Sequence, residues 1–142
     1  MGDHIERITA AFEAFNRRDL DELVELCHPE VEWTPPAELP GSRTYHGHDG
    51  VREAVRDMIG IFPDLRAEAV RFVDKGDRVA GLYIWRGSGG ESGAPIDAFE
   101  VKASFVLDFE GDLARVARFW TTWDDALAEV GETAPSKEKG PA

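Results

Sequence analysis

Two carboxylates are the candidates for acid–base chemistry in this sequence. Glu32 lies in a short alternating segment, and Asp97 lies near the start of a long one. A carboxyl group buried among aromatic side chains has a raised pKa, which lets it take up and release a proton near neutral pH. We therefore name Glu32 and Asp97 as candidate catalytic residues, with simple exposure to solvent as the alternative for each.

Other reactive residue types are present in patterns that fit structural roles better. The segment His46-Gly47-His48-Asp49 contains metal-binding types, but two histidines across a glycine supply no preorganised third ligand. Cys27 is the single cysteine and lies on an apolar stripe, which is typical of a core residue. The stretch Gly87-Ser88-Gly89-Gly90 lacks the lysine that follows a phosphate-binding loop. We expect neither a metal nor a cofactor.

Length and charge exclude several classes of protein. The chain has 142 residues, which fits one domain whose core needs no disulfide. Its formal net charge of −12 opposes binding to nucleic acid and to anionic membranes. The charged N-terminus and the lack of a long apolar run lead us to expect a cytoplasmic protein.

The apolar spacing predicts helices first and strands second. Steps of three and four residues indicate helices over 4–17, from Asp19 to before Pro29, and from Val51 to Phe62, with a short strand at 30–34. Alternation then predicts an antiparallel meander of strands at 65–74, 79–86, 96–109 and 113–123. A last helical turn follows at 124–130. We expect one domain over 1–131 and a disordered tail over 132–142.

Aromatic side chains recur on one face of these strands. The residues that parity places on the inner face are Tyr83, Trp85, Phe105 and Trp123, joined by Phe12 and Phe15 of the first helix. They fit a packed core, and they also fit a concave cavity for a small molecule. The opposite face carries Leu82, Ile84, Val116 and Trp120, which three helices cannot cover as well.

Four phrases carry a resemblance to a known family. They are His28-Pro29-Glu30-Val31-Glu32-Trp33, Tyr45-His46-Gly47-His48-Asp49-Gly50-Val51-Arg52, Phe62-Pro63-Asp64-Leu65 and Phe105-Val106-Leu107-Asp108-Phe109-Glu110-Gly111. Over about residues 4–131 the chain resembles the SnoaL-like branch of the nuclear transport factor two-like superfamily, which includes ketosteroid isomerases and polyketide cyclases. The resemblance implies an α+β fold of the cystatin-like type, a cone-shaped curved antiparallel sheet whose three N-terminal helices enclose a pocket.

The resemblance also implies where catalytic groups should be, and other residues stand there. The ketosteroid isomerase positions correspond to Ala11, Thr34 and Phe105, and the cyclase positions to Thr121 and Ser104. Ketosteroid isomerisation should therefore be undetectable. The pocket residues that the resemblance and parity together imply are Phe12, Phe15, Thr34, Tyr45, Tyr83, Trp85, Phe105, Thr121 and Trp123. Phe105 and Trp123 are expected to line a cavity, so that Phe105→Ala costs less than the roughly 3–5 kcal/mol of a close-packed phenylalanine.

Two functions remain open from the sequence. One is a cofactor-independent cyclase, isomerase or dehydratase that acts on an apolar carbonyl compound through positioning and one or two carboxylates. The other is a protein that binds a small hydrophobic ligand without reacting with it. The missing catalytic residues favour the second function, and the resemblance favours the first.

We predict a homodimer formed through the outer sheet face. Leu82, Ile84, Val116 and Trp120 would otherwise leave a larger apolar patch in water than scattered apolar residues do. Sedimentation of the purified protein at micromolar concentration should give the mass of two chains. A monomer at that concentration would contradict the prediction.

Overall fold

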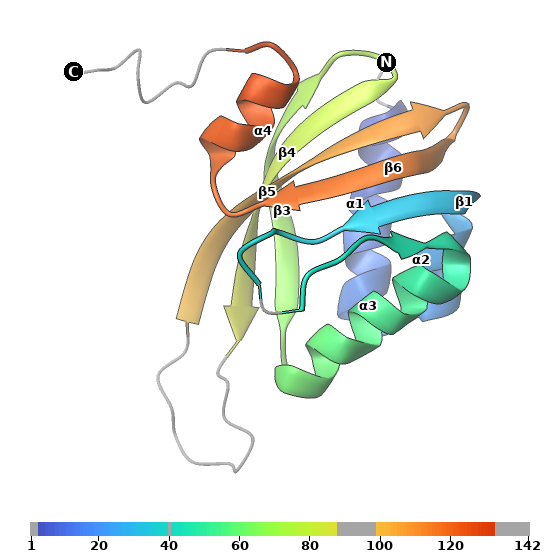
Figure 1. Ribbon diagram of the computed structural model, residues 1–142, viewed down its shortest axis with the longest axis vertical. Coiled ribbons are helices and arrows are strands. Elements are labelled where there is room, and N and C mark those ends of the chain that lie inside the picture. Colours follow the sequence, from blue (N-terminus) through green and yellow to red (C-terminus); the bar gives the residue numbers. More distant parts are fainter. Residues whose placement is uncertain (1–2, 40, 88–98, 133–142) are drawn as a thin grey trace, which may run out of the picture.

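The computed structural model describes residues 3–39, 41–87 and 99–132 (Figure 1). The helices are α1 (Asp3–Asn16), α2 (Leu20–Glu25), α3 (Gly47–Ile61) and α4 (Trp123–Glu129). The strands are β1 (Cys27–Thr34), β2 (Tyr45–His46), β3 (Arg66–Asp74), β4 (Arg78–Gly87), β5 (Phe99–Glu110) and β6 (Leu113–Trp120). Asp97 and residues 133–142 lie outside the described residues, so the predicted tail and domain boundary stay predictions.

The six strands form one curved sheet in the order β2-β1-β6-β5-β4-β3. The predicted antiparallel meander of β3 to β6 is confirmed by the register, which pairs Tyr83 with Ala103 and Phe105 with Phe119. β1 adds itself beside β6 in the parallel direction, and the two-residue β2 pairs with β1. Helices α1 to α3 lie on the concave face, and α4 lies on the convex face (Figure 1).

Arg18 ties the first two helices to the start of β3. It has a left-handed backbone, with a φ of 63°. Its guanidinium donates hydrogen bonds to the carbonyl oxygens of Phe15, Pro63 and Leu65, at 3.0, 2.7 and 2.8 Å. Since these carbonyls belong to the end of α1 and to the segment between α3 and β3, one side chain holds the helical layer against the sheet edge.

His4 closes the narrow end of the concave face. Its Nδ1 lies 2.8 Å from the Gly76 carbonyl oxygen, and its Nε2 lies 3.0 Å from that of Gly111. Both glycines have positive φ, 89° and 67°, which the two hairpin turns require. The imidazole also stacks on Phe109 with ring centroids 3.9 Å apart. The first turn of α1 therefore caps both hairpins.

The last predicted strand ends three residues earlier than expected. β6 stops at Trp120, and Thr122 becomes the N-cap of α4, where its Oγ1 accepts a hydrogen bond from the Asp125 amide at 3.2 Å. Trp123 is therefore the first residue of α4 and packs on the convex face against the cluster of Ala80, Val106 and Ala126. The prediction that Trp123 lies on the inner face was wrong, because the cap turns the chain before that residue is reached.

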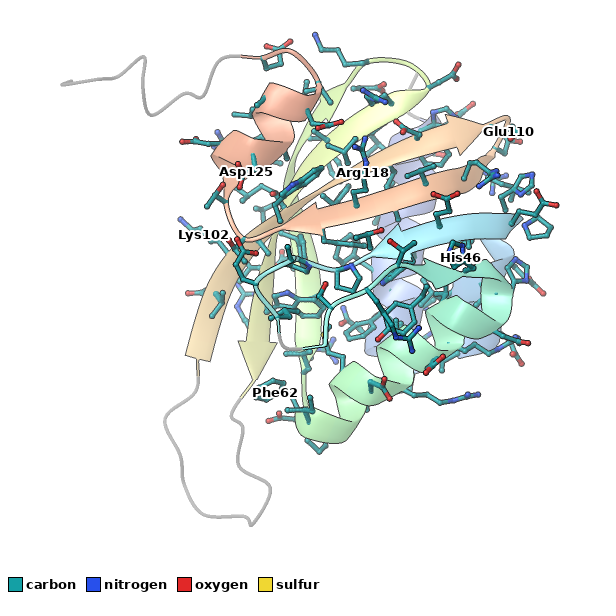
Figure 2. All side chains as sticks on the ribbon, in the orientation of Figure 1. His46, Phe62, Lys102, Glu110, Arg118 and Asp125 are labelled. Atoms are coloured by element: carbon teal, nitrogen blue, oxygen red, sulfur yellow. The ribbon has the colours of Figure 1, made fainter. Side chains whose placement is uncertain are left out.

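Helix α4 covers part of the convex face. Figure 2 shows Arg118 on β6 beside this helix, and its Nη1 lies 2.6 Å from a carboxylate oxygen of Glu129. Trp120 packs into the same cluster, so the chain itself shields one residue of the predicted dimer face. Leu82, Ile84 and Val116 remain half-buried, and the homodimer stays a prediction.

In the described part of the chain, no helix is long and apolar enough to cross a bilayer.

The side chain of Asn16 protects the free edge of β3. Its Nδ2 donates to the Ala67 carbonyl oxygen and its Oδ1 accepts from the Ala67 amide, both at 2.9 Å, as a neighbouring strand would. We expect Asn16→Ala to lower the free energy of unfolding by about 1–3 kcal/mol, because two partly buried backbone groups lose their partners. Urea denaturation would measure the loss. Arg17→Ala, which removes only an exposed ion pair to Glu22, is the control and should cost less than about 1 kcal/mol.

Candidate functional site

An aromatic layer fills the middle of the concave face. It consists of Phe12 from α1 and of Trp33, Tyr83, Trp85, Phe105 and Phe119 from the strands. Tyr83 is at its centre, with ring centroids 5.5 Å from Phe12, 5.1 Å from Trp85 and 5.8 Å from Phe105. Trp33 and Phe119 extend the layer, with centroids 4.9 Å apart. Such distances are typical of favourable edge and tilted ring contacts.

Phe105 rests directly on the sheet at Gly81. The two residues are opposite one another in the β4–β5 pairing, and a Cβ atom at residue 81 would lie only 2.1 Å from Phe105 Cζ. Phe105 is 1% exposed. The ring is therefore part of a close-packed layer, so Phe105→Ala is now expected to cost the full ~3–5 kcal/mol and not less.

The wider end of the concave face is where β1, β4 and β6 end and where β3 and β5 begin (Figure 1). Trp33, Trp85 and Phe119 are half-buried there, whereas Tyr83 and Phe105 behind them are buried. Figure 2 shows Phe62, which follows the end of α3, at this same end. Aromatic rings are therefore partly exposed at the wider end of the concave face, because the strands that would cover them begin or end there.

A groove of about 390 Å³ opens between α1 and β3. Phe12 forms one wall, and Ala67 and Ala69 form the floor. These two alanines are paired with Trp85 and Tyr83 in the β3–β4 register. Because an alanine stands beside each large ring, the surface is hollow next to the aromatic layer.

The rim of this groove, called here the α1–β3 groove, is polar and carries both signs of charge. Its remaining lining residues are Thr9, Glu13, Asn16, Arg66, Glu68 and Arg86. Arg86 contacts Glu68 at 2.8 Å and Glu100 at 3.1 Å. Both polar atoms of the Asn16 side-chain amide are hydrogen-bonded to the backbone of Ala67. Two acidic and two basic residues give the rim no net formal charge.

Tyr83 is a neutral group at ordinary pH. Burial raises the pKa of its phenol well above the usual range, and a hydrogen bond from the Trp85 side chain opposes that shift only in part. A phenol that keeps its proton can donate a hydrogen bond and cannot serve as a general base. Tyr83 is 2% exposed and lies behind Phe12, so a molecule in the groove would first contact Phe12.

The structure brings together five of the residues that the sequence predicted for the pocket. Phe12, Tyr83, Trp85 and Phe105 belong to the aromatic layer, and Phe15 packs on Trp85 with centroids 5.6 Å apart. These are the residues for which helix and strand parity indicated the inner face correctly. Ligand binding by them stays a prediction.

Three other candidates lie away from the layer, and Tyr45 lies beside its member Trp33. Thr121 is exposed in the turn after β6, and Trp123 is the first residue of α4 on the convex face. Thr34 Oγ1 lies 2.9 Å from Thr44 Oγ1 at the base of the 35–44 loop. Tyr45 pairs with Trp33 across β1 and β2, and the Arg43 guanidinium lies 4.1 Å from its ring centroid.

Glu32 does not lie on the concave face. Glu32 is exposed, is paired in register with Val116 on the convex side of β6, and lies 4.0 Å from Arg115. The expectation that it points into the pocket is not met, because Trp33 and not Glu32 takes the inward position in β1. Asp97 lies outside the described residues, so its candidacy rests on the sequence alone.

Sequence reasoning missed Trp33, Phe119 and Gly81. Phe119 alternates with Trp120, so strand parity places it on the inner face. Trp33 is the residue next to Glu32, which was predicted to point inward. The signal for both was the alternation of apolar and polar residues in β1 and β6. No local signal marks Gly81, because its importance comes from the Phe105 ring that β5 places over it.

The potential metal and thiol residues serve the structure. Within the ranges that the structure describes, no three His, Cys, Asp or Glu side chains gather as a metal site. His48 Nε2 lies 2.9 Å from the Cys27 carbonyl oxygen, and His46 is the exposed N-cap of α3. Burial raises the pKa of the Cys27 thiol to about 12, so this group stays protonated and unreactive.

The fold and this site can be compared with known proteins. The profile of the SnoaL-like domain matches residues 8–119. The chain belongs to the SnoaL-like domain family. No curated protein matches the sequence of this SnoaL-like chain.

Several solved structures share the fold of this SnoaL-like chain. One is an NTF2-like protein of unknown function from Burkholderia pseudomallei K96243, with 23% identity, a TM-score of 0.74, and 92% of this chain and 99% of that chain covered. TerC, co-crystallised with polyporic acid, has 21% identity, a TM-score of 0.72, and coverage of 84% and 92%. IdmH, a proposed polyketide cyclase from Streptomyces antibioticus, has 26% identity, a TM-score of 0.68, and coverage of 90% and 98%.

The buried Tyr83 makes the free energy of unfolding depend on pH in the alkaline range. Its pKa is raised in the folded state, so the folded chain holds a proton that the unfolded chain loses above its own pKa of about 10. The free energy of unfolding should therefore be constant with respect to this group below about pH 10 and fall as the pH rises beyond it. Urea denaturation at about pH 8 and about pH 11 would measure the difference. Tyr83→Phe should reduce the fall, and Tyr45→Phe should leave that contribution unchanged.

Proposed function

We propose that this SnoaL-like protein binds a small, uncharged, apolar cyclic compound in the α1–β3 groove. The observation that carries the proposal is the groove itself, a hollow of about 390 Å³ whose wall is Phe12 and whose floor is Ala67 and Ala69. Its volume lies within the range of about 300–1,000 Å³ that is common for small-molecule sites. An apolar wall with a polar rim is the usual composition of such a site.

The charge of the rim supports a neutral ligand. Glu13 and Glu68 stand beside Arg66 and Arg86, so the groove offers no net charge to an anion or a cation. Arg86 is already engaged by two carboxylates. A ligand hydroxyl or carbonyl group can instead meet the Thr9 hydroxyl at the rim, while the rings of the ligand pack against Phe12.

The residues described on the concave face support binding more than catalysis. The aromatic layer includes no carboxylate and no histidine, and its titratable group, Tyr83, is held neutral. A general base has to be within hydrogen-bond reach of the proton that it removes. Glu32 cannot meet this condition from the convex side of β1.

A cofactor-independent cyclase or isomerase is the second candidate. It is favoured by the 26% identity to IdmH, a proposed polyketide cyclase, over nearly the whole of both chains. In that case the buried Tyr83 phenol would donate a hydrogen bond to a carbonyl oxygen after Phe12 moves aside. The proton would have to be removed by a carboxylate, and the candidates are Glu13 and Glu68 at the groove rim and Asp97, which the sequence provides.

Native mass spectrometry of freshly purified protein would test for a retained ligand. Chemical change of that compound on incubation with the protein would favour the enzyme, and its recovery unchanged would favour the binding protein.

The groove can also be tested with a fluorescent probe, 2-naphthol. Ala69→Leu should fill the floor and weaken the affinity for 2-naphthol by about tenfold or more. Ala37→Leu adds the same volume at an exposed position in the 35–44 loop and is the matched control. Titrations followed by fluorescence, with circular dichroism to verify folding, measure the effect. Equal affinity of the Ala69→Leu and Ala37→Leu variants would exclude the groove as the site.

A further inference from the structure

Phe105 is held in place from both sides of its ring. On the sheet side it rests on Gly81, where no side chain intervenes. On the helix side it contacts Phe12, with ring centroids 5.8 Å apart. Tyr83 and Phe119 flank it at 5.8 and 6.4 Å. The height of the Phe105 ring above the sheet is therefore determined by the missing Cβ of Gly81.

The position of Phe12, and with it the wall of the α1–β3 groove, depends on the height of the Phe105 ring. The same ring that contacts Phe105 forms the wall of the α1–β3 groove and is half-buried. Phe12 cannot move toward the sheet while Phe105 occupies the space over Gly81, because the two rings belong to one close-packed layer. Gly81, Phe105 and Phe12 thus form a stack whose outermost member borders the groove.

We propose that Phe105 is a positioning residue that sets the depth of the α1–β3 groove and thereby limits its ligand to compounds of one or two fused rings. This inference rests on the proposed function, because it concerns the ligand of the same groove. The volume of about 390 Å³ is near the lower end for small-molecule sites, which agrees with a small ring system. Loss of the Phe105 ring would empty the space over one inward-facing position of β4. Neighbouring inward-facing positions on a strand are roughly 7 Å apart.

The substitution Gly81→Ala has the opposite effect. Gly81 has no positive φ, so alanine is allowed by the backbone, and the three atoms nearest to the added Cβ all belong to the Phe105 ring. A methyl group at residue 81 has to lift that ring toward Phe12. We infer that Phe105→Ala deepens the groove and that Gly81→Ala makes it shallower, through the same stack.

Two fluorescent probes that differ by one ring test the limit. The wild type should bind 2-naphthol and discriminate against 2-hydroxyanthracene. Phe105→Ala should improve the affinity for 2-hydroxyanthracene by about tenfold, with little gain for 2-naphthol, because a further apolar ring becomes buried. Phe105→Leu, which keeps more of the core volume, should change the preference in the same direction if the alanine variant does not fold. An unchanged ratio of the two affinities in a folded variant would overturn the inference and leave the proposed function standing.

Gly81→Ala supplies the complementary test. It should weaken 2-naphthol binding in the wild-type background and have no effect in the presence of Phe105→Ala, where the ring is gone. Gly60→Ala is the control, because a Cβ at that helical position meets no atom within 4 Å. Equal effects of Gly81→Ala in both backgrounds would show that the two residues are not coupled and would overturn the inference.

The same cycle read by urea denaturation needs no ligand. Gly81→Ala should lower the unfolding midpoint in the wild type and leave it unchanged or raised with Phe105→Ala or Phe105→Leu. A wild type that binds neither probe would overturn the proposed function and the ring limit, while the unfolding cycle would still decide whether Gly81 seats Phe105.

Discussion

The contact between Phe105 and Gly81 is the interaction on which the concave half of the molecule depends. The outer end of the Phe105 ring can lie this close to the opposing residue only because that residue has no side chain, and the β4–β5 register places a glycine there. Phe12 and Tyr83 pack on that ring in turn. Burial of these aromatic groups supplies a large part of the apolar area that stabilises the helical layer on the sheet.

The ends of the cone follow from different constraints. The narrow end is closed because His4 contacts the carbonyls of two hairpin turns and stacks on Phe109. The wide end is less covered because strands begin and end there, and half-buried Trp33 and Trp85 remain. Polar groups of the described residues lie at the rim of the α1–β3 groove and on the convex face. There they contact solvent or form ion pairs, such as that of Arg78 with Asp108.

The same distribution bears on chemistry within the SnoaL-like family. At the catalytic positions implied by the family resemblance, this chain has residues that cannot exchange a proton near neutral pH, among them Phe105 in the middle of the layer. Tyr83 is buried close by, but its raised pKa keeps the phenol protonated, so it can donate a hydrogen bond and cannot remove a proton. Aromatic rings occupy the middle of the concave face in this chain, and the α1–β3 groove borders them.

The order of the elements apart from β2, and the inner face of β4 and β5, could be determined from the sequence alone. Helical spacing indicated α1, and alternation placed Tyr83, Trp85 and Phe105 together, because both periods are local properties of the chain. The resemblance of short phrases indicated the fold and the family correctly. The alternation in β1 marks Trp33 as the inward residue, so the prediction that Glu32 points inward was wrong.

Tertiary structure decided the features that depend on residues distant in the chain. Parallel pairing of β1 with β6 sets the direction of Trp33, and the cap at Thr122 moves Trp123 to the convex face. The role of Gly81 exists only because a ring from β5 lies over it, and the groove exists only because α1 passes beside two alanines of β3. Packing across such distances is not encoded in any single segment, since side-chain volumes fit together only after the sheet has brought them into contact.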